Sequence, residues 1–220
     1  MIRQSFRKQW VASLAMFLLC TVVLHFPAYA GVDEDLISAV ENNRTHRIKN
    51  LLEAGADPDV RDLHGETMLM LAARNKNPEI GYLLLEAGAN PNLQNKYGET
   101  AAMLASYYGQ LNLIKQLYAK GARIDHDGWN PLIYAASKGY TEIVGFLLDY
   151  GARVDATTEN GTTALMMAAR GNYYNAAELL LKYGANTSMK NEANDTALSW
   201  AQKGGHTDIV QLLSHNDAAH

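Results

Sequence analysis

One stretch of the chain recurs at a nearly constant spacing, and this repetition constrains the fold more than any other feature. Its clearest copy is residues 65–92, GETMLMLAARNKNPEIGYLLLEAGANPN. A threonine or asparagine opens the copies at spacings of 33, 30, 33 and 33 residues, and a Gly-Ala pair ends them. Self-similarity with a period near 33 residues is typical of a solenoid, in which equivalent units stack in sequence order. The opening positions are Thr67, Thr100, Asn130, Thr163 and Thr196, and the closing pairs begin at Gly55, Gly88, Gly121, Gly151 and Gly184.

Within this copy, two apolar runs flank a polar break. The first run, Met68–Ala73, precedes the break at Arg74–Pro78, and the second run, Ile80–Leu85, follows it. This order predicts a short helix, a tight turn and a second helix that ends at a glycine in the left-handed conformation. We therefore expect an all-α solenoid of about six helix-turn-helix units.

The motif resembles the ankyrin repeat, whose pattern is G-x-T-P-L-H-x-A-A, then a helix with L-L, then G-A-D-x-N. GWNPLIYAA at Gly128–Ala136 and GTTALMMAA at Gly161–Ala169 match it closely, and the resemblance spans Asp33 to about Asp217. It implies short β-hairpin loops, here called fingers, between units. The histidine of the family pattern is replaced in every unit, so we expect apolar packing in place of its hydrogen bond. That position holds Met70, Met103, Ile133, Met166 and Ser199.

The repeats divide the chain into six units with short segments at both ends. The first unit lacks the G-x-T opening and the last loses its terminal glycine at Asp217, so both have the character of solenoid caps. The fourth unit opens three residues early, which predicts a shortened finger. The expected segments are a signal peptide 1–30, units 31–61, 62–94, 95–124, 125–157, 158–190 and 191–217, and a frayed tail 218–220.

Two recurring apolar positions explain why such units would stack. Alanine recurs in the first helix, where a small side chain lets the two helices of a unit approach closely. Leucine recurs in the second helix, where its bulk fills the space between units. These positions are Ala72, Ala105, Ala135, Ala168 and Ala201, and Leu51, Leu84, Leu117, Leu147, Leu180 and Leu212 or Leu213.

The first thirty residues predict a cleaved secretory signal peptide. Three basic residues among the first eight precede an apolar run at 11–24, and Ala28-Tyr29-Ala30 supplies the small residues that a signal peptidase recognises. The run is shorter than the roughly 20 residues that a transmembrane helix needs. We expect cleavage after Ala30, with an uncleaved anchor as the alternative. Cleavage would remove Cys20, the only cysteine, and leave a chain that forms no disulfide.

Charge and composition argue against several classes of function. The chain has 19 basic and 23 acidic residues, and three of the basic ones fall in the signal peptide. This acidic balance argues against nucleic acid as a partner, because phosphate binding needs a basic stripe. No Ser-His-Asp arrangement, phosphate-binding loop or recognisable carboxylate pair emerges, so we expect no catalytic residues.

We also expect no metal and no cofactor. Met70, Met103 and Met166 occupy one repeat position, where methionine serves most simply as adaptable core filler. The alternative is a thioether site for a soft metal such as Cu(I), or a target for oxidants.

Aromatic residues indicate a partner-binding surface. The ankyrin resemblance implies that a partner binds the concave face, which the fingers and the exposed ends of the first helices form. Four aromatic residues gather at such positions on units three and four, beside the shortened finger, and Trp and Tyr are enriched in binding hot spots. The expected protein-binding residues are Tyr97, Tyr107, Tyr108 and Trp129, with His64, Arg74, Lys138 and Arg170.

The function that we expect is non-catalytic protein binding, as a module or scaffold in an exported compartment. The signal peptide, the size and the cysteine-free repeats are similar to those of periplasmic ankyrin proteins of Gram-negative bacteria. Some members of that group are associated with a periplasmic catalase and peroxide resistance, so the resemblance implies support of such an enzyme. We expect a periplasmic monomer, or a secreted one, whose partner is a protein rather than nucleic acid or, after cleavage, a membrane.

Three alternatives stay open at this point. The chain could be an immunity protein that neutralises a secreted toxin, which would bind with nanomolar affinity. It could be a metal-handling protein or an enzyme with an unfamiliar site. It could also be a membrane-tethered scaffold that retains its N-terminus.

Overall fold

The computed structural model describes residues 26–217. Most of the expected signal peptide and the tail 218–220 lie outside the described residues. The first described helix, α2, covers Phe26–Glu41 and therefore crosses the expected cleavage site after Ala30. The chain divides between Asp57 and Pro58 into two compact parts, which are described separately.

The first part contains α2 and α3 (Thr45–Glu53), which pack as an antiparallel pair around a small apolar core. Leu36 and Val40 of α2 and Ile48 of α3 are completely buried in it. The carboxylate of Asp33 accepts a hydrogen bond of 2.9 Å from the backbone N–H of Asp57, which ties the end of this part back to its first helix.

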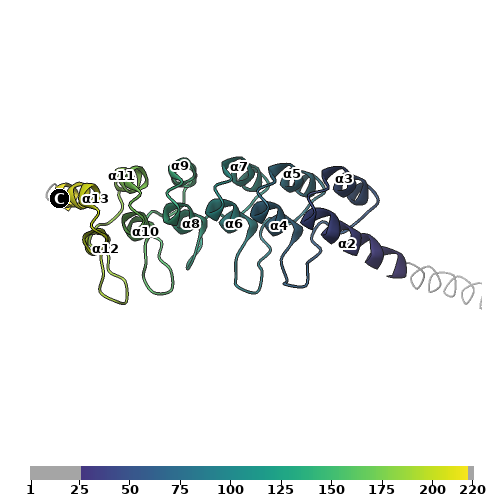
Figure 1. The fold of residues 1–220 in the computed structure, drawn as a ribbon, viewed down its shortest axis with the longest axis horizontal. Coiled ribbons are helices and arrows are strands. Elements are labelled where there is room, and N and C mark those ends of the chain that lie inside the picture. The colour runs from purple at the N-terminus through teal and green to yellow at the C-terminus, as the bar shows by residue number, and fades with distance from the viewer. Residues whose placement is uncertain (1–25, 218–220) are drawn as a thin grey trace, which may run out of the picture. The chain divides into compact units, whose positions relative to one another are not determined.

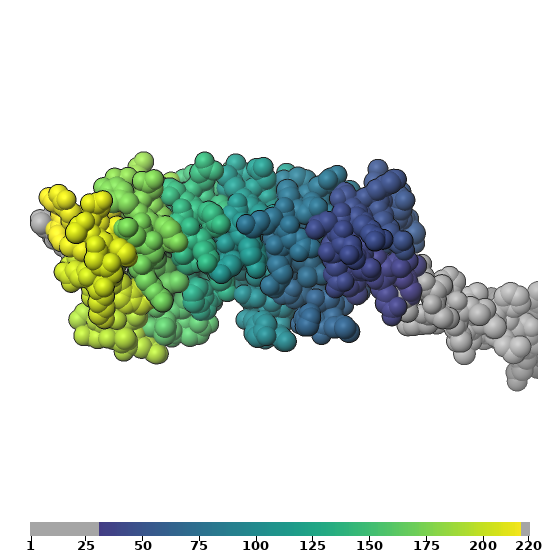
Figure 2. Space-filling model, in the orientation of Figure 1, coloured from purple at the N-terminus to yellow at the C-terminus, as the bar shows by residue number. Residues whose placement is uncertain are grey.

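The second part contains five helix pairs that follow one another along a solenoid. In Figure 1 the first helices of the pairs, α4 to α12, form one row and the second helices, α5 to α13, form another. Figure 2 shows the same segments as successive bands in sequence order. Each first helix packs on the first helix of the next pair, which confirms the expected all-α solenoid. The pairs are α4 (Met68–Arg74) with α5 (Pro78–Glu86), α6 (Ala101–Tyr107) with α7 (Leu111–Ala119), α8 (Pro131–Ser137) with α9 (Thr141–Asp149), α10 (Ala164–Arg170) with α11 (Tyr174–Lys182), and α12 (Ala197–Gly204) with α13 (Thr207–Asp217).

The core of this part follows the recurring alanines and leucines of the sequence. The five alanines of the first helices are completely buried, as are Leu84, Leu117, Leu147 and Leu180 of the second helices. In the last pair Leu213, rather than Leu212, takes the buried position. Met70, Met103 and Met166 are buried as well, in agreement with a role as core filler.

The residue that opens each first helix is its N-cap. The Thr67 hydroxyl accepts a hydrogen bond of 3.3 Å from the Met70 N–H, and the Asn130 side chain accepts one of 3.0 Å from the Ile133 N–H. Such bonds satisfy N–H groups that have no partner inside the helix. Threonine or asparagine is therefore required at this position by the local hydrogen bonding as well as by the repeat.

The structure corrects our expectation that apolar packing alone replaces the missing histidine. The Met70 sulfur lies 3.5 Å from the Thr67 backbone nitrogen, and the Met103 sulfur lies 3.3 Å from the Thr100 nitrogen. In the last pair, the Ser199 hydroxyl accepts the equivalent bond from the Thr196 N–H at 3.0 Å. Three units thus keep a side-chain acceptor at the helix start, since a thioether is a weak acceptor and a hydroxyl a normal one.

The fingers are turns with little strand character. Among the described residues their only β-pairings are isolated bridges, between Arg61 and Thr67 and between Thr157 and Thr163. Most fingers are closed by an internal backbone bond, such as Asn95 N–H to Glu99 O at 3.0 Å. The finger before α8 is visibly shorter than its neighbours (Figure 1). It donates the Gly128 N–H to Thr157 O of the next finger at 3.1 Å.

Candidate protein-binding site

An aromatic cluster lies where the shortened finger meets α8. We define it as Tyr107, Trp129 and Tyr134. The ring of Tyr134 is central, with its centroid 5.0 Å from that of Trp129 and 5.8 Å from that of Tyr107. The Tyr107 and Tyr134 rings meet edge to face, the arrangement that aromatic quadrupoles favour. Three elements, α6, the finger and α8, therefore contribute to one continuous aromatic surface.

This surface is accessible to solvent. Trp129 is 37% exposed, and Tyr107 and Tyr134 are half-buried. Trp129 directly precedes the buried N-cap Asn130, so its backbone is fixed at the start of α8, and its indole packs on the Tyr134 ring. A large aromatic side chain that is held in place and remains accessible loses little conformational entropy on binding.

Two pockets share Trp129 and Tyr134. The helix-side pocket, of about 320 Å³, lies toward the ends of the first helices. Its lining combines apolar rings and a thioether with two cations, and Lys138 Nζ lies 4.2 Å from the centroid of the Tyr107 ring. The lining residues are Tyr107, Trp129, Tyr134, Ser137, Lys138, Met167, Arg170 and Gly171.

The finger-side pocket, of about 270 Å³, lies toward the finger tips and is acidic. Much of its negative charge is already engaged. Asp127 forms an ion pair of 2.8 Å with Arg153, and both oxygens of Glu99 accept hydrogen bonds. The lining residues are Gln94, Tyr97, Gly98, Glu99, Met103, His126, Asp127, Trp129, Tyr134 and Glu159.

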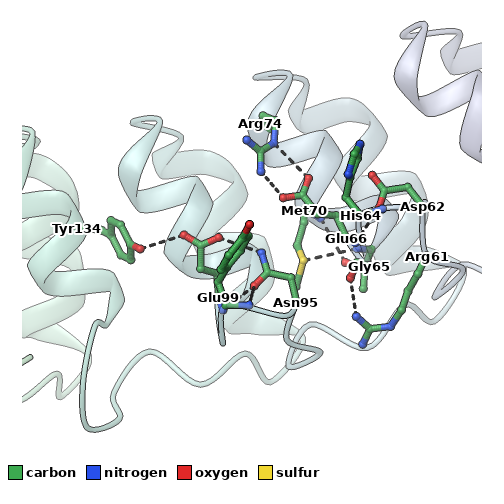
Figure 3. A network of polar contacts seen from close by, with 12 residues as sticks. Arg61, Asp62, His64, Gly65, Glu66, Met70, Arg74, Asn95, Glu99 and Tyr134 are labelled. Carbon is green, nitrogen blue, oxygen red and sulfur yellow. Dashed lines mark hydrogen bonds and ion pairs between the residues drawn. The ribbon is translucent and has the colours of Figure 1, made fainter. Parts of the chain in front are cut away.

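A hydrogen-bonded chain fixes the centre of the aromatic cluster. The Tyr134 hydroxyl donates to Glu99 Oε1 at 3.0 Å, and the Asn95 amide donates to Glu99 Oε2 at 2.9 Å (Figure 3). Burial raises the pKa of the Tyr134 phenol, and the charge of Glu99 and its hydrogen bond raise that pKa further. The phenol therefore stays neutral at physiological pH and acts as a fixed donor.

Four of the eight residues that the sequence predicted as partner-binding line the helix-side pocket, namely Tyr107, Trp129, Lys138 and Arg170. Tyr97 is 74% exposed and lines the finger-side pocket. The Tyr108 ring packs edge to face on Tyr107 with centroids 5.1 Å apart, outside both linings.

The other two predicted residues, His64 and Arg74, line neither of these pockets. Arg74 forms a two-pronged ion pair with the buried carboxylate of Glu66, with Nε 3.2 Å from Oε2 (Figure 3). His64 is exposed in the finger before α4, where its backbone N–H donates to Asp62 at 2.8 Å. The charge of Arg74 is therefore satisfied within the chain.

Four lining residues of the helix-side pocket were outside the set predicted from the sequence, and Tyr134 and Met167 are the two with large side chains. Both follow directly on the position that the family histidine would occupy. A residue there lies one helical turn before the exposed end of its helix, as Tyr134 does relative to Lys138. The spacing of four residues between Tyr134 and Lys138 is the sequence signal that places both on one face of α8.

Neither a metal centre nor a membrane span is evident in the part of the chain that the structure describes. No three His, Cys, Asp or Glu side chains within residues 26–217 gather closely enough to hold a metal ion. The helices of the same range are all too short or too polar to cross a bilayer.

Comparison with known proteins agrees with this architecture. The family described as "Ankyrin repeats (3 copies)" matches residues 36–127, 69–158, 103–191 and 154–220. The human Cyclin-dependent kinase 4 inhibitor B is 33% identical over 124 residues, which cover 55% of this chain and 90% of that protein.

Two further relatives are matched over less than half of their length. The rat Ankyrin repeat domain-containing protein 46 is 49% identical over 104 residues, covering 46% of this chain and 44% of the relative. The human Protein phosphatase 1 regulatory subunit 27 is 43% identical over 56 residues, covering 24% and 36%. Because the family match extends over most of the chain and coincides with the stacked helix pairs, the protein belongs to the ankyrin-repeat family.

Proposed function

We propose that the protein is a non-catalytic scaffold whose protein partner docks on the aromatic cluster. Ankyrin repeats are protein–protein interaction modules, and the family match covers most of the chain. The observation that carries the proposal is the gathering of Tyr107, Trp129 and Tyr134 between two pockets. Accessible aromatic side chains beside concave surfaces are the usual anchors of binding hot spots.

Two relatives support a regulatory or scaffolding role by their names. One is an inhibitor of a kinase and another is a regulatory subunit of a phosphatase. Both names describe proteins that act on an enzyme rather than perform its reaction. We extend this relationship to the present chain, which would act as a monomer on a protein partner, with neither nucleic acid nor a membrane bound to the same face.

We propose further that this binding takes place after export, in the periplasm or outside the cell. The N-terminal sequence supports export through its basic start, its apolar run and the Ala28-Tyr29-Ala30 site. N-terminal sequencing of the exported protein tests the point. Gly31 as the first residue is the expected result, whereas a retained Met1 would favour the membrane-tethered scaffold.

The docking proposal is tested with tagged protein and the exported fraction of its host. We expect wild-type protein to retain a partner and Trp129→Ala to bind that partner more weakly by about 2 kcal/mol or more, because truncating a central aromatic anchor removes a hot spot. Tyr150→Ala is the matched control, since Tyr150 is 52% exposed and lies outside the linings of both pockets. Titration calorimetry with the purified partner measures the difference.

Equal affinities for wild-type protein and Trp129→Ala, with unchanged circular dichroism, would reject the aromatic cluster as the docking site. The identity of the retained protein separates the biological roles. An exported enzyme such as a catalase would fit a scaffold that supports peroxide resistance. A secreted toxin bound with nanomolar affinity would instead fit an immunity protein.

A further inference from the structure

We propose that the segment of the partner that enters the helix-side pocket carries an aspartate or glutamate beside an apolar side chain. The carboxylate would bind between Lys138 and Arg170, and the apolar side chain would pack on the aromatic cluster. This inference rests on the proposed docking function and specifies the chemistry of the partner.

The repeat itself shows which charges are satisfied inside the chain. In two units, an acidic residue directly precedes the N-cap and pairs with a cation eight residues later. Glu66 pairs with Arg74 in this way, and Asp195 pairs with Lys203 Nζ at 2.5 Å. The ion pair joins the two ends of one short first helix. The first helices have nearly the same length in all five pairs, so an acid and a cation at these two positions could pair in the same way in any of them.

The fifth unit keeps the cation of this pair and lacks the acid. Arg170 occupies the position of Arg74 and Lys203, whereas Thr162 stands where Glu66 and Asp195 stand. The Arg170 guanidinium lies 5.5 Å from the centroid of the Trp200 ring, and no carboxylate of the described residues forms an ion pair with it. The fifth unit therefore presents a cation at the same position, with a buried threonine where the units of α4 and α12 have the acid.

Lys138 is a second cation of the same pocket that lacks an ion pair within the described residues. Lys138 is exposed, and its ammonium lies over the Tyr107 ring without an ion pair to any described carboxylate. In the fourth unit the acidic position is occupied by Trp129. Two cations and an apolar floor thus line one pocket that lacks a balancing negative charge.

These features select a carboxylate-bearing segment. A carboxylate accepts charge-assisted hydrogen bonds from both lysine and arginine, and the rings and the Met167 thioether offer apolar area beside them. The finger-side pocket offers less free charge for the reverse argument. Asp127 and Glu99 already have partners within the chain, so the exposed Glu159 is its one carboxylate without an ion pair or a hydrogen bond to a described residue.

The test is selection from a random dodecapeptide library displayed on phage, with each peptide fused at its C-terminal end so that no free terminal carboxylate is presented. Selected sequences are then synthesised with amidated ends, and each Asp or Glu is replaced by Asn or Gln. Fluorescence anisotropy measures binding to wild-type protein, Trp129→Ala, Arg170→Gln and Lys203→Gln. The last variant removes the same charge at the equivalent position of the next unit, where the cation is already paired.

We expect wild-type protein to enrich peptides with Asp or Glu next to an apolar residue. Their affinity should fall about tenfold when the acid is replaced by its amide, because a charge-assisted contact is lost. Arg170→Gln should reduce this preference to about threefold or less, and Lys203→Gln should retain it. The preference should also weaken as salt is raised, as expected for a partly exposed ion pair.

Two results would overturn the inference. They are enrichment of neutral or basic peptides, and an acid preference that Arg170→Gln leaves intact. If the enriched peptides are neutral or basic but lose affinity in Trp129→Ala, the docking proposal stands and only the charge preference fails. If no selected peptide depends on Trp129, both proposals fail.

Discussion

The outer and middle units of the second compact part have the same helix-turn-helix architecture. They differ in the charged and aromatic side chains on their first helices. In the helix pairs that begin at α4 and α12, the acidic residue before the N-cap is paired with a cation of the same unit. In the pairs that begin at α6, α8 and α10, aromatic residues and a threonine interrupt this pairing, and Lys138 and Arg170 remain without a carboxylate.

This difference shows that a repeat protein can specify a binding site by local departures from its own pattern. The buried alanines and leucines are the same in the outer and middle units, so the fold tolerates replacement of the acidic residue before the N-cap. Charged residues that form an ion pair inside a unit contribute to stability, whereas cations without such an ion pair are available to another molecule. The distinction can be tested by comparing equivalent substitutions.

The largest expected effect addresses the shared core. Leu84→Ala and Leu147→Ala remove equivalent, completely buried side chains from an outer and a middle unit. Each should lower the free energy of unfolding by about 2–5 kcal/mol, because a buried leucine leaves a cavity. Urea denaturation followed by circular dichroism measures both values. A cost below about 1 kcal/mol at Leu147 would mean that the middle units are packed loosely and that the comparison is not limited to the surface.

The next effect separates paired from unpaired cations. Arg74→Ala should destabilise the protein by about 1–3 kcal/mol, because it leaves the buried Glu66 carboxylate without its cation. Arg170→Ala at the equivalent position should cost less than about 1 kcal/mol, since no ion pair is lost and only the contact with the Trp200 ring is removed. The same denaturation experiment measures both variants. Equal costs at the two positions would contradict the distinction between outer and middle units.

A smaller effect is expected at the centre of the aromatic cluster. Tyr134→Phe keeps the ring and removes the hydroxyl that donates to Glu99 at 3.0 Å. The loss should be about 1 kcal/mol of stability, the net value of one hydrogen bond. Tyr97→Phe is the control, because Tyr97 is 74% exposed and its hydroxyl has no hydrogen bond to a described residue. If the two variants were equally stable, the hydrogen bond from Tyr134 to Glu99 would contribute nothing to the stability of the fold.

The smallest effect concerns pH in the last unit. The hydrogen bond from Lys203 lowers the pKa of the Asp195 carboxyl, with further contributions from Trp200 and Ser199. Because the pKa is lower in the folded state, the pair stabilises the protein above the unfolded pKa of about 3.9 and loses that contribution as the pH falls through the folded value. Asp195→Asn should therefore show a slightly smaller drop in Tm between pH 7 and pH 3 than wild-type protein. An identical drop would show that the exposed pair is fully screened by solvent.

Much of the fold was predictable because the same capping residues and terminal glycines recur in successive units. Thr67 and its equivalents predict the helix starts, and Gly88 and its equivalents predict the helix ends, where Gly88 has a φ of +92°. The contribution of Met70 and Met103 to capping was not predicted. A methionine is normally assigned to the core, and only the distance between the sulfur and the threonine N–H reveals its second role.

The candidate site was predicted less completely. The sequence identified Trp129 and Tyr107 as exposed aromatic residues of neighbouring units, and the structure brings both to one pocket. It also grouped Arg74 with them, although Arg74 is engaged by Glu66. Tyr134 was missed because its position in the repeat is occupied by leucine in the units of α4 and α6 and so gave no signal of exposure.

The repeat pattern is sufficient to specify the all-α solenoid, because a period near 33 residues with recurrent caps and core positions leaves little freedom in local structure or stacking order. The three-dimensional structure was needed to show which charged side chains meet. Glu66 and Arg74 lie eight positions apart at the two ends of one short helix, and the sequence alone does not reveal that their side chains form an ion pair. Once that pair is known, the exchange of Glu66 for Thr162 explains why Arg170, at the position equivalent to Arg74, lies beside the Trp200 ring without a carboxylate.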